Sequence, residues 1–308
     1  MNYQSIIIDT LGSDKGSEEV IFGASLLLNQ YPNLHLILVG DENLIKKHIS
    51  DLSRVSIIHT LEKVDNNDDV LKSIYDKPNA SIYLACKELK ENDSAVGLIS
   101  SGNTGGMLMG VMKYLRKDPN LRPCLSALMP NIDGTNTLLV DVGATVDCSA
   151  NQLHDFAILG RDFMSNIFDI KSPRIGLLSI GEESHKGNKV TKEAHQILKE
   201  DESINFVGNI EGNIALTGIC DVLIGDGFTM NQLIKVTEGT AKRIIRDVSL
   251  LRKDDLELIK SLINKYDLPN LGGGIILGST KLVMKCRGNS SREAILNVGK
   301  ILLQYIEK

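Results

Sequence analysis

The chain has 308 residues and a formal net charge of −5, so a broad basic surface for duplex DNA is not expected. It has no Trp and only 4% aromatic residues, which argues against an aromatic-lined groove for single-stranded nucleic acid. We therefore expect no nucleic-acid partner. The five cysteines are widely spaced and odd in number, which predicts neither a disulfide framework nor a cysteine-rich zinc site and favours a cytoplasmic location.

Short apolar runs alternate along the chain with longer helical patterns. Helices are predicted at 17–29, with Ser17 as N-cap, and at 43–49, and others begin at Thr104, Leu153, Lys189 and Thr229. The apolar strands between helices are typical of an α/β protein whose mainly parallel sheet is covered on both faces. We predict strands at residues 5–9, 35–39, 55–59, 95–99, 137–142, 174–179, 204–207 and 222–224.

Five of the predicted strands end in polar loops that contain glycine. The loops span residues 9–14, 100–105, 141–147, 181–188 and 225–229. Ligands of open α/β sheets bind at the carboxyl ends of the strands, so five such loops in one chain predict a composite site. The alternative for any one loop is ordinary turn chemistry, because Gly, Asp and Asn are common turn residues.

Several familiar catalytic motifs are missing. The sequence has no P-loop, no G-x-G-x-x-G, no H-E-x-x-H and no G-x-S-x-G, and its six histidines show no metal-ligand spacing, so we expect neither a metal nor a cofactor. Backbone amides and amide side chains remain. Residues 101–106 would open a helix whose first N–H groups suit an anion such as phosphate, with Asn103 as a further donor. Lys186 and Lys192 flank a second helix start, where the alternative is simple capping by Asn188.

The segment 238–271 differs from the rest of the chain because it is both strongly charged and amphipathic. Its apolar spacing predicts two helices. They would either pack on the core, which is the commoner arrangement, or form a hairpin that faces a partner or a membrane. Its basic residues are Lys242, Arg243, Arg246, Arg252 and Lys253, among others.

Long strings in the loop regions carry a family resemblance. They lie at 100–106, 138–147, 174–192, 205–211 and 226–240, and include Leu-Leu-Val-Asp-Val-Gly-Ala-Thr-Val-Asp and Lys-Gly-Asn-Lys-Val-Thr-Lys-Glu-Ala. In this order they closely resemble the PlsX family of phosphate acyltransferases over most of the chain. One departure is Arg287, which stands where the family usually has His.

The resemblance implies a three-layer α/β/α fold like that of phosphotransacylases and isocitrate or isopropylmalate dehydrogenases. It implies a single domain over residues 1–308 with a protruding helical hairpin at 238–271, and a homodimer. The implied reaction converts acyl-[acyl carrier protein] and inorganic phosphate to acyl phosphate and free carrier protein, for phospholipid and fatty acid metabolism. Weak contact of the hairpin with a membrane surface is left open.

The resemblance and the loop pattern together nominate site residues. Asn103 and Asn188 would hold the oxyanion, Lys186 would assist phosphate, and Lys242, Arg243 and Arg246 would dock the acidic carrier protein. The alternatives are an acetyl-phosphate-forming, PlsX-like subunit of a glycine reductase type complex, or a non-catalytic binding subunit with the same fold. The expected phosphate- and substrate-binding residues are Asp9, Gly12, Asp14, Ser101, Gly102, Thr104, Gly105, Asp141, Gly143, Asp147, Lys192, Glu211, Asp226 and Asn231.

Overall fold

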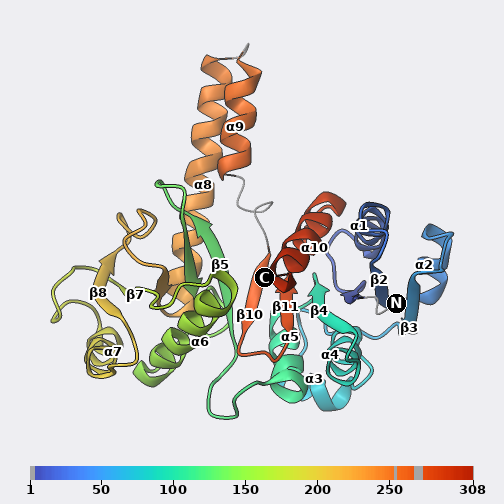
Figure 1. Ribbon diagram of the computed structural model, residues 1–308, viewed down its shortest axis with the longest axis horizontal. Coiled ribbons are helices and arrows are strands. Elements are labelled where there is room, and N and C mark those ends of the chain that lie inside the picture. Colours follow the sequence, from blue (N-terminus) through green and yellow to red (C-terminus); the bar gives the residue numbers. More distant parts are fainter. Residues whose placement is uncertain (1–3, 253–254, 267–272, 308) are drawn as a thin grey trace. The chain divides into compact units, whose positions relative to one another are not determined.

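The computed structural model describes residues 4–252, 255–266 and 273–307 (Figure 1). Its contacts divide the chain into two compact units. Unit 1 comprises residues 1–123 and 272–308, and unit 2 comprises residues 124–271. The expectation of a single domain over residues 1–308 stays a prediction.

Unit 1 is built on parallel strands. Its strand order is β3-β2-β1-β4-β11-β10, in which only β10 runs antiparallel to its described neighbour β11. The strands nearest the centre are apolar throughout; Ile6, Ile7 and Ile8 are fully buried, as expected for a sheet covered on both faces. The bounds are β1 (Ser5–Asp9), β2 (His35–Gly40), β3 (Val55–His59), β4 (Ala95–Ser100), β10 (Gly274–Leu277) and β11 (Leu282–Lys285).

Helices cover both faces of this sheet (Figure 1). Helices α1 (Ser17–Gln30) and α10 (Arg292–Ile306) pack together on one face, and α4 (Ser81–Glu91) lies on the other with α5 (Thr104–Gly110). Close packing of α1 on α10 needs glycine, since a Cβ on Gly23 would lie 2.6 Å from Ile295 Cβ. The remaining helices are α2 (Glu42–His48), α3 (Val70–Asp76) and the π-helix at Val111–Leu115 that continues α5.

Unit 2 has the same layered design. Its strand order is β5-β6-β9-β7-β8, and only the β5–β6 pair is antiparallel among these described strands. Helices α6 (Ala150–Phe168) and α7 (Lys189–Glu200) pack together, and α8 (Gly227–Leu251) contacts β6. The strand bounds are β5 (Cys124–Pro130), β6 (Asn136–Val140), β7 (Ile175–Ser179), β8 (Phe206–Glu211) and β9 (Val222–Ile224).

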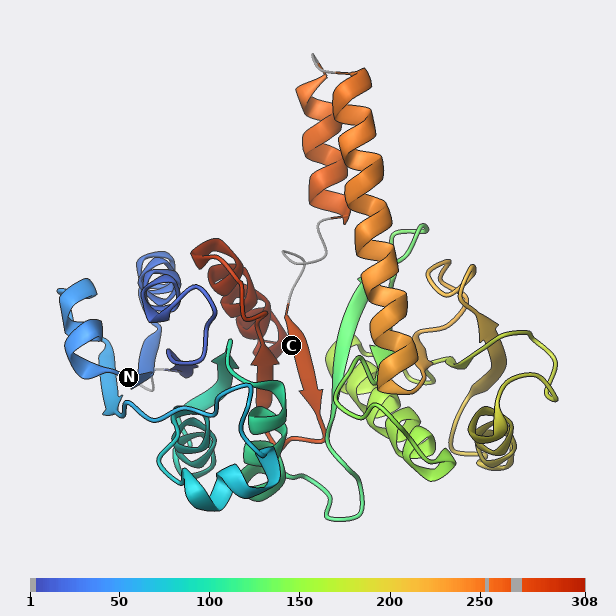
Figure 2. The ribbon, with the colours of Figure 1, turned by 180° about the vertical axis from the view of Figure 1, so that it is seen from behind.

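The two predicted helices of the amphipathic segment are present. The second half of α8 packs along α9 (Leu256–Tyr266), and the pair forms a hairpin, seen from both sides in Figures 1 and 2. Residues 253–254 and 267–271 of the expected hairpin, Lys253 among them, lie outside the described residues. Within the described part of the chain, no helix combines the length and apolar character needed to cross a bilayer.

The mainly parallel α/β architecture is confirmed, but some predicted boundaries are wrong. Strand β8 begins at Phe206, because Ile204 belongs to a turn in which its N–H donates to the Asp201 carbonyl oxygen over 3.0 Å. The N-cap of α1 is Gly16, and Ser17 is the first helical residue. Helix α6 begins at Ala150, three residues before Leu153, because Ser149 and Gln152 form a capping box there.

The cysteines allow a first experimental check. All five are free and buried, and burial raises the pKa of Cys220 and Cys286 to about 12. Because the thiolate is the reactive form, we expect Ellman's reagent at mildly alkaline pH to leave the native protein unlabelled and to label all five thiols after denaturation in guanidinium chloride. Rapid labelling of one thiol in the native protein would contradict this burial.

Candidate functional site

In unit 1, three loops meet at the carboxyl ends of β1, β4 and β11. The Ser100 hydroxyl donates to Asp9 Oδ2 over 2.7 Å and accepts from the Gly102 N–H at 2.9 Å, which ties the first loop to the second. The Asp14 N–H and the Ser13 hydroxyl both donate to the Gly288 carbonyl oxygen, which ties the first loop to the third. The structure therefore brings the expected residues of the first two loops together.

Asp9 has a structural role at this junction. Its side chain is buried, and burial raises the pKa of its carboxyl group. Besides the Ser100 hydroxyl, it accepts a hydrogen bond from the Leu11 N–H at 3.1 Å. These bonds hold the backbone of the loop in place.

Glycines permit the close approach of the first two loops. A Cβ on Gly12, whose φ is +82°, would lie 2.7 Å from Gly102 Cα. A Cβ on Gly105 would lie 2.9 Å from a methyl group of Val70. Both positions therefore need glycine for packing, and Gly12 also needs it for its backbone conformation.

Asn103 is the N-cap of α5. Its Oδ1 accepts from the Gly106 N–H at 2.9 Å, and its Nδ2 donates to Asn66 Oδ1 over 3.3 Å. Thr104 is the first residue of the helix. Because the Gly102 and Gly106 N–H groups are both satisfied within the protein, the row of free amides expected at 101–106 is only partly available for an anion.

Lys285 also belongs to this cluster, although the sequence analysis did not identify it as a site residue. It is the last residue of β11, paired in register with Ser100, and its Nζ donates to the Ser101 carbonyl oxygen over 3.3 Å and, more closely, to that of Cys286. The sequence does contain a signal for it. Like the five strands singled out above, this apolar strand is followed by a polar loop with glycine, Lys285-Cys286-Arg287-Gly288.

In unit 2, Asp141 organises the loop after β6. Its buried carboxylate accepts hydrogen bonds from the N–H groups of Leu125, Ala144 and Thr145, while burial raises its pKa. Like Asp9, it orients a loop. Next to it, Gly143 has a φ of +130°, and a Cβ there would lie 3.1 Å from Asn231 Nδ2.

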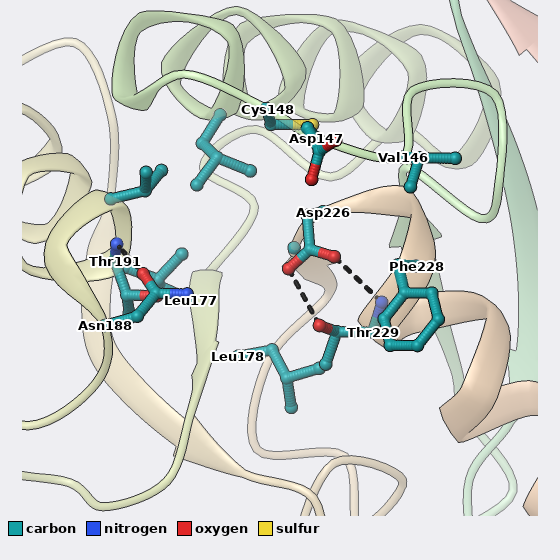
Figure 3. A pocket seen from close by; sticks show the side chains of 13 residues that line it. Val146, Asp147, Cys148, Leu177, Leu178, Asn188, Thr191, Asp226, Phe228 and Thr229 are labelled. Carbon is teal, nitrogen blue, oxygen red and sulfur yellow. Dashed lines mark hydrogen bonds between the residues drawn. The ribbon is translucent and has the colours of Figure 1, made fainter.

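A cavity of about 460 Å³ opens at the carboxyl ends of β7 and β9 within unit 2 (Figure 3). Three of the expected site residues line it: Asp147, Asn188 and Asp226. Apolar side chains form much of the remaining wall, and the exposed ring of Phe228 stands at its edge. The cavity therefore joins polar groups to an apolar surface. Its further lining residues are Val146, Cys148, Leu153, Leu177, Leu178, Val190, Thr191, Gly225 and Thr229.

Two of these polar residues cap helices. Asn188 Oδ1 accepts from the Thr191 N–H at 2.9 Å and from the Thr191 hydroxyl at 3.0 Å, at the start of α7. Asp226 accepts from both donors of Thr229 at 2.8 Å, at the start of α8. The capping alternative is correct for Asn188, but its Nδ2 donates to no described residue, so it keeps a free donor for a ligand.

Other predicted residues lie around this cavity or away from it. Asn231 donates to the Val142 carbonyl oxygen over 3.2 Å and so supports the loop after β6. Lys186 is half-buried in the loop before α7, and Lys192 is exposed on α7. Glu211 ends β8, and neither it nor the two lysines line the cavity. The structure thus joins only part of the expected unit 2 set in one cavity.

The proposed docking residues Lys242, Arg243 and Arg246 are exposed on α8. Within the described residues, none of them forms an ion pair. They are therefore available to an acidic partner.

Similar solved structures share the fold at low sequence identity. A phosphotransacetylase from Streptococcus pyogenes has a TM-score of 0.65 at 18% identity, covering 99% of this chain and 95% of that one. A branched-chain phosphotransacylase from Enterococcus faecalis V583 has a TM-score of 0.62 at 15% identity, covering 98% of each chain. These likenesses confirm the expected phosphotransacylase-like α/β/α fold.

Sequence comparison is more specific. The family model described as "Fatty acid synthesis protein" matches residues 4–299. The phosphate acyltransferase of Streptococcus pneumoniae strain ATCC 700669 is 36% identical over 319 aligned positions, which cover 99% of this chain and 96% of the relative. The chain therefore belongs to the fatty acid synthesis protein family, the PlsX family that its loop motifs resemble.

Proposed function

We propose that this protein is a phosphate acyltransferase that transfers the acyl group of acyl-[acyl carrier protein] to inorganic phosphate. The products are acyl phosphate and free carrier protein, for use in phospholipid and fatty acid metabolism. Family membership and the 36% identical phosphate acyltransferase of Streptococcus pneumoniae support the reaction class. The acyl carrier protein as donor follows from the family resemblance.

The cavity of unit 2 is the observation that carries the proposal. A thioester presents a polar carbonyl group flanked by apolar chain, and this cavity presents Asn188 and two acidic residues beside the side chains of Leu153, Leu177 and Val190. We assign it to the thioester end of the donor. The free Nδ2 of Asn188 is the group best suited to hold the oxyanion that develops on the carbonyl oxygen.

The nucleophile in this proposal comes from the substrate. The thiol that lines the cavity, Cys148, is buried and donates to the Thr145 carbonyl oxygen, so we assign it no role as nucleophile. An oxygen of hydrogen phosphate attacks the thioester carbon, the C–S bond breaks, and the thiolate of the carrier protein leaves. The proton lost by hydrogen phosphate passes, directly or through water, to that thiolate. Positioning of the two substrates would supply much of the acceleration.

The expected roles are divided between the two sets of loops. In unit 1, the loop set would bind phosphate and Asn103 would stabilise the oxyanion. In unit 2, Lys186 or Lys192 would assist phosphate and Asn188 would stabilise the oxyanion. Asp9 and Asp141 would orient the loops, since their carboxylates are already engaged by donors of the protein.

The central test offers phosphate and acyl-carrier thioesters of graded chain length to the purified protein and follows acyl phosphate. Turnover of long-chain thioesters supports the proposal. Turnover of acetyl thioesters alone would instead identify an acetyl-phosphate-forming subunit of a glycine reductase type complex. No turnover with any donor would favour a non-catalytic subunit with the same fold.

The exposed basic residues of α8 lead to a separate prediction about binding of the carrier protein. We expect Lys242→Glu, Arg243→Glu and Arg246→Glu together to raise the KM for acyl-carrier substrate about tenfold or more at low salt, because like charges oppose docking. Added salt should weaken carrier binding to the unaltered protein. Steady-state kinetics across a salt series measures both effects.

A charge-matched control is Lys47→Glu, Lys87→Glu and Lys90→Glu, three exposed positions of unit 1. This variant should keep the KM of the unaltered protein. Carrier binding that ignores both ionic strength and the α8 substitutions would contradict the docking role.

We further propose a cytoplasmic homodimer with weak contact to the membrane surface. Five free thiols support a reducing compartment, and the resemblance supports the dimer. Leu250, Leu251 and Leu256, all exposed where α8 ends and α9 begins, support the membrane contact. Sedimentation equilibrium and flotation with anionic vesicles test the two statements.

A further inference from the structure

Lys285 forms no ion pair among the described residues. No described carboxylate lies in ion-pair distance of its Nζ, whose two hydrogen bonds both go to backbone carbonyl oxygens, of Ser101 and Cys286. An ammonium group carries three N–H donors, so one remains available. Burial lowers the pKa of Lys285, while Cys286, Asp9 and Asp14 act against this shift and favour the charged form.

Ser101 adds a second unsatisfied group at the same place. The residue is only 2% exposed, and its Oγ has no hydrogen-bond partner within the described chain. A buried hydroxyl without a partner costs free energy that a bound acceptor would restore. Its carbonyl oxygen receives the Lys285 bond, so the free hydroxyl and the free ammonium donor belong to neighbouring groups.

Of the two nearby acids, Asp9 is already engaged by hydrogen-bond donors of the protein. Asp9 accepts from the Leu11 N–H and the Ser100 hydroxyl, and its own pKa is raised by burial. Gly288 lets Asp14 approach the third loop closely, since a Cβ on Gly288 would lie 2.2 Å from Asp14 Oδ2. An unpaired cation, an unpaired hydroxyl and glycine-lined backbone together match the needs of a small tetrahedral oxyanion.

We infer that Lys285 and Ser101 bind the inorganic phosphate substrate at the carboxyl ends of β4 and β11. This inference rests on the proposed function and deepens it, because it assigns the nucleophile to a pair of residues within unit 1. Lys285 neutralises part of the charge on phosphate and fixes one of its oxygens, while the Ser101 hydroxyl donates to another. Phosphate binding by this pair requires no acyl donor.

The test therefore measures phosphate binding directly, by ³¹P NMR line broadening and by thermal shift, alongside kinetics. Lys285→Gln keeps amide donors for the two carbonyl oxygens and removes the charge. We expect it to weaken phosphate binding, and to raise the KM for phosphate, by about ten- to a hundredfold, with the KM for the acyl donor unchanged. Ser101→Ala should weaken phosphate binding about fivefold.

Lys281 offers a matched control. It precedes the same strand, and its Nζ also donates to two backbone carbonyl oxygens, those of Leu89 and Asn92, both at 2.9 Å. Lys281→Gln should bind phosphate as the unaltered protein does. Lys285→Arg keeps the charge and should restore much of the binding if Lys285→Gln folds poorly.

The outcomes separate this inference from the proposed function. Equal phosphate affinity in the unaltered protein and Lys285→Gln would overturn the inference while leaving acyl phosphate formation intact. Phosphate binding that depends on Lys285 without any turnover would support the inference and count against the proposed function. If the unaltered protein does not bind phosphate at millimolar phosphate concentrations, the inference is wrong.

Discussion

Asn188→Asp is expected to fold like the unaltered protein and to lower the rate of phosphorolysis by about a hundred- to a thousandfold. The structure separates two functions of this side chain. Its Oδ1 caps α7 through the N–H and hydroxyl of Thr191, whereas its Nδ2 has no described partner, and Asn188 is one of the residues that line the cavity. Aspartate caps a helix as well as asparagine does, but it has no donor to offer an oxyanion. Turnover and thermal unfolding, measured together, check this result.

Two further substitutions at the same position isolate the cause. Asn188→Ser keeps a good capping oxygen and adds no charge, so it distinguishes loss of the amide donor from electrostatic repulsion. Asn188→Ala also loses the cap and should cost about 1 kcal/mol of stability. Asp41→Asn, the reverse substitution at the N-cap of α2, is the control. It should change neither turnover nor thermal stability by much. Turnover of Asn188→Asp equal to that of the unaltered protein would remove Asn188 from the chemistry.

The local signals in the sequence were strong for strands and ambiguous for polar residues at helix starts. Apolar runs such as Ile6 to Ile8 predict buried parallel strands, and the structure confirms them. Asn103, Asn188 and Asp226 follow strands in glycine-bearing loops, a pattern that suits both ligand binding and N-capping. All three are caps in the structure. A side chain that only caps a helix differs from one that can also bind a ligand in its second polar atom. The structure shows whether that atom already has a partner within the protein.

The strands that the sequence analysis did not predict depend on pairing between residues far apart in the sequence. Strand β5 begins directly after Pro123, and Ser126 interrupts its apolar run, so its local pattern predicts little. Antiparallel pairing with β6 defines it. Strand β11 is distant in sequence from β4, yet it inserts beside it and brings Lys285 to Ser101. Local periodicity says nothing about which strands become neighbours. The resemblance to a family supplied the activity, while the placement of Lys285 required the structure.

Gly12→Ala is expected to lose about 2–4 kcal/mol of stability and most phosphorolysis activity, because two costs combine at this position. A left-handed backbone, with φ of +82°, costs an alanine about 1–2 kcal/mol. The new Cβ would also lie 2.7 Å from Gly102 Cα, a backbone atom that cannot turn aside as a flexible side chain would. Relief of that overlap must move one loop away from the other and disturb the junction that holds Ser101. Urea unfolding and initial rates measure the two losses.

Gly16→Ala separates the cost of the left-handed backbone from the cost of the steric overlap. Gly16 has nearly the same φ, +86°, and lies in the same loop region, but a Cβ there would meet nothing within 4 Å. It should therefore lose only about 1–2 kcal/mol from backbone strain and keep its activity. The difference between the two variants measures what close approach of the first two loops contributes. Equal stability and equal activity in Gly12→Ala and Gly16→Ala would show that the approach of Gly12 to Gly102 does not matter for the site, and that the two loops tolerate being pushed apart.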